Sequence, residues 1–223
     1  VTVEDDDTSG LTVLDDGRSD LEEDNRKGYT YAVAMLSRPL DLVSVAVSPS
    51  LDEVSAMPPQ LLFWPHRWDE PQNVTIFAVD DVFDTGDRLC LIRHILSTSD
   101  PNLLPRPAEL NLTIIDDESA GIEIYAGDLV VYEAGGEAAY AVKLTSQPLE
   151  HVTVHVHAEL GHGGHPQLIY SPENLTFTNE TWNDTQTVRL SAVDDDVDEG
   201  NNHSVRVWHT TDSADPMYAG DSA

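Results

Sequence analysis

The stretch Asp5-Asp6-Asp7-Thr8-Ser9-Gly10 decides the fold, because it returns later in the chain as Asp116-Asp117-Glu118-Ser119-Ala120-Gly121. Other segments repeat at a similar spacing: Tyr31-Ala32-Val33 with Tyr140-Ala141-Val142, Ala78-Val79-Asp80-Asp81 with Ala192-Val193-Asp194-Asp195, and Asp100-Pro101 with Asp215-Pro216. The copies lie about 110 residues apart, which is an ordinary domain length. The 223-residue chain therefore contains two copies of one structural unit.

Each copy is built from short runs in which apolar and polar residues alternate. Val43, Val45 and Val47 form one such run, and Val152, Val154 and Val156 form the equivalent run of the second copy. Alternation of this kind, broken by Pro, Gly and Asp, predicts antiparallel strands with one buried face. We predict an all-β chain of two tandem immunoglobulin-like antiparallel sandwiches preceded by an orphan strand. The predicted boundaries are 1–9 for the strand and an acidic linker, 10–120 for the first sandwich and 121–223 for the second.

These residues resemble the Calx-beta repeat family. The resemblance is carried by Asp5–Gly10, by the Phe-x4-Trp-x3-Gln spacing that starts at Phe63 and again at Phe177, and by the acidic run Val193–Gly200. It implies a seven-stranded sandwich, commonly in tandem, with calcium bound in some members by acidic loops at one end. The first copy departs from the pattern, because Val82 and Thr85 stand where the second copy has Asp196 and Glu199.

The two ends of the chain differ in a way that concerns the last strand of the repeat. Val1-Thr2-Val3-Glu4-Asp5 aligns with Leu112-Thr113-Ile114-Ile115-Asp116, the last strand of the first copy, whereas the second copy stops before that strand. We expect Val1, Thr2 and Val3 to complete the second sandwich of a neighbouring molecule by strand addition, giving a head-to-tail homopolymer. The alternative is that the chain is an excerpt of a longer tandem-repeat protein.

The acidic loops are candidate calcium sites, because calcium takes six to eight oxygen ligands and clustered carboxylates supply them. If the fold is correct, three acidic stretches of each copy meet at one end. The candidate ligands of the first copy are Glu23, Asp80, Asp81, Asp84, Asp116, Asp117 and Glu118. Those of the second are Glu133, Asp194, Asp195, Asp196, Asp198 and Glu199. The alternative is a hydrated acidic linker with no bound cation.

Asparagine sequons indicate the compartment. Six occur, more than chance gives in a chain of this length, which predicts N-linked glycans and an extracellular or cell-surface protein. They begin at Asn73, Asn111, Asn174, Asn179, Asn183 and Asn202.

The charge excludes several classes of partner. With 41 acidic and 11 basic residues the chain carries a formal charge of −30. Such a polyanion repels phosphate backbones, so we predict no nucleic-acid partner. No continuous apolar run is long enough to span a bilayer, so we predict no membrane insertion.

The sequence contains no motif of an enzyme active site, and we predict a protein without catalytic activity. His155 and His157 share one face of a predicted strand, which fits either a zinc or copper site or an exposed polar face. Trp68 and Trp182 occupy equivalent repeat positions and are expected in the cores rather than in a sugar-binding cleft. We therefore predict a structural glycoprotein, the protomer of a surface filament. The competing hypothesis is a calcium-binding adhesion or regulatory module.

Overall fold

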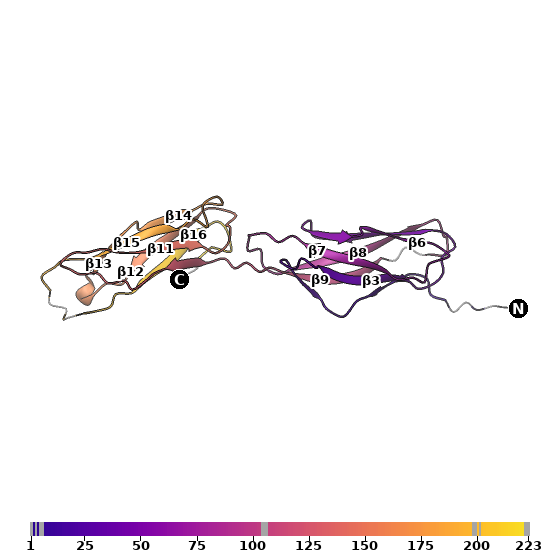
Figure 1. The fold of residues 1–223 in the computed structure, drawn as a ribbon, viewed down its shortest axis with the longest axis horizontal. Helices are drawn as coiled ribbons and strands as arrows, with labels where there is room; N and C mark the ends of the chain where they lie inside the picture. The colour runs from indigo at the N-terminus through magenta and orange to yellow at the C-terminus, as the bar shows by residue number, and fades with distance from the viewer. Residues whose placement is uncertain are drawn as a thin grey trace. The chain divides into compact units, whose positions relative to one another are not determined.

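The computed structural model describes residues 2, 4, 7–103, 107–197, 200 and 202–220. It divides into two compact units, shown in Figure 1 from indigo to magenta and from pink to yellow. The first unit comprises Val1–Asp81 and Gly86–Asp117, and the second comprises Val82–Thr85 and Glu118–Ala223.

The first unit is a pair of β-sheets. Its strands are β1 (Leu11–Leu14), β2 (Asp20–Glu22), β3 (Tyr29–Met35), β4 (Val43–Pro49), β5 (Val54–Met57), β6 (Gln60–Phe63), β7 (Gln72–Ala78), β8 (Arg88–Thr98) and β9 (Ala108–Ile115). One sheet has the order β1-β3-β7-β5 and the other the order β2-β9-β8-β4-β6. Strand β9 pairs antiparallel with β8 and parallel with β2, so it is the only neighbour that holds β2 in the described sheet.

The second unit repeats this plan with fewer strands. Its elements are β10 (Ile122–Tyr125), β11 (Ala138–Leu144), β12 (Val152–Ala158), the short 3-10 turn η1 (His162–Gly164), β13 (Leu168–Ser171), β14 (Asn174–Phe177), β15 (Gln186–Ala192) and β16 (Val207–Ser213). The sheets have the orders β10-β11-β15-β13 and β14-β12-β16. Among its described residues, the second unit has no counterpart of β2 or of β9, and β16 forms the edge of its sheet.

The predicted all-β fold of two immunoglobulin-like sandwiches is confirmed. The alternating valines lie where the pattern places them: Val43, Val45 and Val47 point into the first core from β4. Val152, Val154 and Val156 point into the second core from β12. Cys90 is buried as a small apolar side chain, while Trp68 and Trp182 pack against the two cores at equivalent positions. No helix within the described residues is both long and apolar enough to cross a membrane.

A buried aspartate accepts the same pair of backbone hydrogen bonds in each unit. Asp100 Oδ2 accepts a hydrogen bond from the backbone nitrogen of Leu40 at 2.7 Å, and Asp215 Oδ2 accepts one from Leu149 at 2.8 Å. Their Oδ1 atoms accept from backbone nitrogens two residues ahead in the chain. The aspartate of the repeated Asp-Pro pair therefore ties the turn after β8 to the loop before β4 in the first unit, and the turn after β16 to the loop before β12 in the second.

Candidate functional site

Several acidic residues gather where two parallel strands of the first unit end. Strands β2 and β9 run in the same direction, so the residues that follow them emerge side by side. Glu23 follows β2 and its backbone nitrogen donates to the carbonyl of Ile115 at 3.1 Å, which continues the ladder. Asp116 follows β9, and its backbone nitrogen donates to Asp87 Oδ1 at 3.2 Å. Pairing of the strands thus brings together carboxylates that lie far apart in the sequence.

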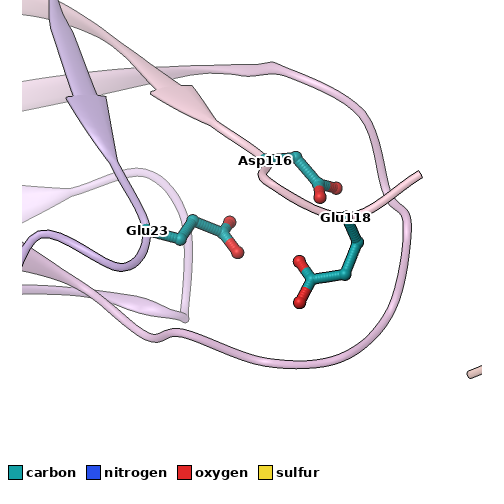
Figure 2. A group of neighbouring side chains, drawn as sticks. All are labelled: Glu23, Asp116 and Glu118. Atoms are coloured by element: carbon teal, nitrogen blue, oxygen red, sulfur yellow. The ribbon is translucent and has the colours of Figure 1, made fainter. Parts of the chain in front are cut away.

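Figure 2 shows the resulting cluster of Glu23, Asp116 and Glu118, in which the carboxyl groups of Glu23 and Glu118 point toward each other. One carboxylate oxygen from each of the three residues lies within 4.8 Å of the others. Glu23 is only 4% exposed, whereas Asp116 and Glu118 are partly exposed. This spacing and this oxygen-only donor set fit a hard divalent cation such as calcium. We call these three residues the acidic cluster.

An arginine that the sequence did not single out lies beside the acidic cluster. Arg88, the first residue of β8, places its guanidinium 2.8 Å from Glu53 and 3.4 Å from Glu23. Even so, the pKa of Glu23 is raised to about 6, first by burial and then by the charges of Asp81 and Asp116, while Arg88 acts in the opposite direction. The protein therefore holds this carboxylate in an environment that favours a nearby positive charge.

The remaining candidate ligands of the first copy occupy different places. Asp80, Asp117 and Glu118 form a second group whose ligand atoms lie within 4.8 Å of one another, so Glu118 belongs to both groups. Asp81 acts on Glu23 through its charge. Asp84 accepts a hydrogen bond from the backbone nitrogen of Ala120 at 2.7 Å, within the second unit. Its carboxylate therefore has a structural partner in the chain itself.

The candidate ligands of the second copy are not brought together within the described residues. Glu133, Asp194, Asp195 and Asp196 are exposed, and no group of three potential ligands includes them. Asp198 and Glu199 lie outside the described residues. The physical reason is visible in the first unit, where two of the three cluster residues follow β9. The described part of the second unit has no equivalent strand.

The sequence reasoning missed a buried tyrosine–histidine pair that occurs in both units. The hydroxyl of Tyr31 lies 2.7 Å from Nε2 of His94, and that of Tyr140 lies 2.8 Å from Nε2 of His209. The aromatic rings of each pair meet edge to face. His94 and His209 share the spacing that relates Asp100 to Asp215, so the signal was present in the repeat.

These pairs predict acid sensitivity. Burial lowers the pKa of both His94 and His209, so the unfolded chain binds a proton at a higher pH than the folded chain does. Their contribution to stability is present above the unfolded pKa of about 6.5 and is lost as the pH falls through the lower folded pKa. The melting temperature should therefore fall as the pH is lowered from 7.5 to 5.5. Its slope against pH should be smaller in His94→Phe than in the natural chain. Equal slopes for the two proteins would contradict the prediction.

The sequons and the proposed donor strand lie at exposed positions or outside the described residues. Every sequon asparagine is exposed, as a glycan requires: Asn73, Asn111, Asn174, Asn179, Asn183 and Asn202. Asn174 Oδ1 accepts a hydrogen bond from Nδ1 of His155 at 2.7 Å. Val1 and Val3 lie outside the described residues, and Thr2 is exposed and belongs to no strand.

His155 and His157 occupy a polar, aromatic face of β12. The His157 ring stacks on that of Trp208 with centroids 5.3 Å apart, and its Nε2 lies 2.9 Å from the hydroxyl of Thr210. No group of three possible metal ligands includes either histidine among the residues described. This arrangement fits the expected exposed polar face better than a metal centre.

Comparison with known proteins gives similarities of fold. No family model matches the chain, and no curated protein matches it. Among solved structures, CBD12 from CALX1.2 is similar at 18% identity and a TM-score of 0.38, over 92% of this chain and 82% of that one. The calcium binding domain CBD12 of CALX1.1 is similar at 20% identity and a TM-score of 0.32, over 86% and 76%. The E. coli chaperone DraB is similar at 10% identity and a TM-score of 0.39, over 96% and 93%. At these identities the likeness concerns tandem immunoglobulin-like sandwiches and nothing finer.

Proposed function

We propose that this chain is a non-catalytic extracellular structural glycoprotein, the protomer of a surface filament assembled head to tail by β-strand donation. In this proposal Val1, Thr2 and Val3 of one molecule add to the second unit of the next. The observation that supports it is a difference between the units. Among the described residues, the second unit lacks a counterpart of β9 and also lacks the strand segments that β9 holds in the first unit.

Segments that pair with β9 in the first unit have counterparts in the second unit that form no strand. In the first unit β9 pairs with β2 and with the first residues of β8, and Leu21 of β2 is 1% exposed. The corresponding segment of the second unit, Leu129–Tyr132, forms no strand, and its Val130 and Tyr132 are 59% and 65% exposed. Residues 202–206, the counterpart of the start of β8, form no strand either. A strand at the position of β9 would add ladder hydrogen bonds to both segments.

The glycoprotein part of the proposal rests on the exposed sequons. Glycans at six exposed positions would cover both units and would hinder association through their faces. Association through sheet edges would then be favoured over association through sheet faces. A glycosylated structural protein outside the cell also agrees with a chain in which the single cysteine, Cys90, is buried.

Assembly of the purified chain tests the proposal. We expect oligomers that lengthen with concentration, visible by negative-stain microscopy and by light scattering. Val1→Asp and Val3→Asp should abolish them, because a charge at an inward position of the donated strand cannot be buried without a large cost. Val79→Asp, a change at an exposed valine of the first unit, is the matched control. Monomers at every concentration would overturn the proposal and favour an excerpt of a longer tandem-repeat protein.

A second candidate function is calcium binding, and the acidic cluster favours it. We propose that Glu23, Asp116 and Glu118 would hold the ion, with Asp80 and Asp117 close by. When bound, the cation would supply the positive charge that the buried Glu23 lacks. Arg88 already supplies part of that charge, so it would compete with the cation for Glu23.

Calcium titration followed by thermal unfolding tests the second candidate. Calcium at about 100 times its Kd should stabilise the first unit by about 2.7 kcal/mol. Glu118→Gln should reduce this gain, whereas Glu22→Gln, at an exposed position next to the cluster, should leave it unchanged. The absence of any shift in millimolar calcium would rule out a calcium site at the cluster.

A further inference from the structure

One sequon asparagine stands beside a histidine on the outer face of the second unit. Asn174 of β14 lies directly opposite His155 of β12. Its Oδ1 accepts a hydrogen bond from Nδ1 of His155 at 2.7 Å. An N-linked glycan is attached to the side-chain nitrogen of asparagine, so this bond to the oxygen persists when a glycan is present. The bond holds the amide in one orientation and thereby fixes the direction in which a glycan leaves the sheet.

Aromatic rings continue the same face next to Asn174. His155 and His157 project from one side of β12, because side chains alternate along a strand, and their ring centroids lie 6.4 Å apart. The His157 ring stacks on that of Trp208, the residue opposite it on β16, and hydrogen-bonds to the hydroxyl of Thr210. All three rings are partly exposed. We call His155, His157 and Trp208 the ring face.

The ring face has the chemistry that binds a sugar. A pyranose ring packs its C–H groups on aromatic rings, while its hydroxyl and acetamide groups hydrogen-bond to polar side chains. The ring face offers aromatic surface and imidazole nitrogens together. Neighbouring strands lie about 4.8 Å apart, so the path from β14 across β12 to β16 is about 10 Å. The two N-acetylglucosamine residues that begin an N-linked glycan have a similar length.

The other two sequons that lie on strands have different neighbours. Asn73 of β7 lies opposite Ala32, and Asn111 of β9 lies opposite Leu91. These aliphatic side chains offer neither a hydrogen bond to the asparagine amide nor an aromatic ring. Asn174 therefore differs from them, because its amide is held by a neighbouring side chain and aromatic rings lie within reach of the attached sugars.

We propose that the first two sugars of a glycan on Asn174 lie across β12 and pack on the ring face, so that they form an ordered part of the second unit. The inference rests on the glycoprotein part of the proposed function and deepens it by naming the glycan that the protein itself binds. It does not depend on filament assembly. The ligand is an N-acetylglucosamine disaccharide, linked covalently to the strand beside its binding surface.

Thermal unfolding of the full chain, secreted from a glycosylating host, tests the contact. Thr176→Ala removes the sequon but keeps Asn174 and its bond to His155. The melting temperature of the second unit should fall by about 4 °C, the shift that one aromatic contact of ordinary strength gives a domain of about 100 residues. The same substitution in chain made without glycans measures the cost of the threonine alone and should have a much smaller effect.

A matched control uses the sequon at Asn111. Thr113→Ala removes that sequon, whose asparagine lies opposite Leu91. Its effect on the melting temperature should be the same with and without glycans, because no ring face lies opposite Asn111. Equal losses from Thr176→Ala in the two forms of the chain would overturn the inference, as would an Asn174 that mass spectrometry shows to carry no glycan.

An NMR measurement separates a bound glycan from a glycan that merely shields the surface. The acetamide methyl signals of sugars packed on aromatic rings are displaced from those of the free disaccharide, and Thr176→Ala identifies the signals that belong to Asn174. His157→Ala should return them toward the free position, whereas His151→Ala, at an exposed histidine before β12, should not move them. Signals that His157→Ala leaves unchanged would contradict the contact.

The remaining outcomes concern the source of the sugar and the filament. Binding of the added free disaccharide to the ring face of unglycosylated chain, without a glycan-dependent loss in Thr176→Ala, would assign the face to an external saccharide and overturn the inference. Monomers at every concentration together with the glycan-dependent loss would overturn the filament and support the inference. The two proposals therefore fail separately.

Discussion

Replacing Asp215 by alanine should lower the free energy of unfolding of the second unit by about 3 kcal/mol, because its two hydrogen bonds join a charged acceptor to backbone donors. Asp215 is 3% exposed, and its carboxylate accepts from the backbone nitrogens of Leu149 at 2.8 Å and Met217 at 2.9 Å. The alanine variant leaves both donors without this acceptor. It also releases the loop that carries Leu149.

Urea denaturation measured by tryptophan fluorescence checks this prediction. Asp215→Asn keeps one carbonyl acceptor and should fall between the natural chain and the alanine variant. Asp212→Ala removes an exposed carboxylate three residues earlier and serves as the control. Asp100→Ala should reproduce the loss in the first unit, since Asp100 bonds Leu40 and Asn102 in the same way. A loss below about 0.5 kcal/mol, the range of ordinary surface changes, would show that the repeated aspartate is dispensable.

The second large effect is expected at Arg88. Arg88→Met should destabilise the first unit by about 3 kcal/mol at neutral pH, because it removes the cation beside a buried carboxylate. Arg88 contacts Glu53 at 2.8 Å and Glu23 at 3.4 Å, and the side chain of Glu23 is 2% exposed. Methionine is of similar length and keeps the apolar packing of the arginine stem.

The loss at Arg88 should depend on pH in a defined direction. The pKa of Glu23 is raised to about 6 by burial, and removal of Arg88 raises it further. A carboxyl group with a raised folded pKa destabilises the fold as the pH rises from its unfolded value of about 4.3 through the folded value. The variant should therefore lose most stability above pH 6 and little below about pH 4.5. Thermal unfolding across this range measures the difference.

Two further variants assign the effect to the carboxylate. The double variant Arg88→Met/Glu23→Gln should recover most of the lost stability, since it removes the charge that Arg88 offsets. Arg93→Met removes an arginine whose ion pair with Glu109 lies on the surface, and it should change stability by less than about 1 kcal/mol. A pH-independent loss in Arg88→Met would mean that packing, rather than charge, explains its contribution.

The sequence predicted the strands well because the pattern that defines them is local. Val43, Val45 and Val47 alternate with small or polar residues, and such alternation has one stable arrangement at the face of a core. The internal repeat gave the strand prediction independent support, because the same alternation occurs in the second copy and forms the equivalent strand there. Sheet order depends on contacts between distant segments, and the parallel pairing of β2 with β9 left no local signal.

The acidic cluster was predicted only in part for the same reason. Glu23 and Asp116 were grouped from the repeat and lie close together, whereas Asp84 bonds to Ala120 because its loop contributes to the second unit. Arg88 was overlooked because a single arginine at a strand start is common and its partners, Glu23 and Glu53, lie on other segments. The histidines of the buried pairs were overlooked because the partner of each, a tyrosine, lies in the opposite sheet.

The parallel pairing of β2 with β9 has a mechanical consequence. Tension applied along the chain would reach β2 at Asp20, its beginning, and β9 at Ile115, its end. Neighbouring parallel strands pulled from opposite ends slide past each other, so their ladder bonds share the load and must rupture together. Once the load passes β1 and reaches β2, we expect the β2–β9 ladder to break at a higher force than a ladder of the same length that opens one bond at a time.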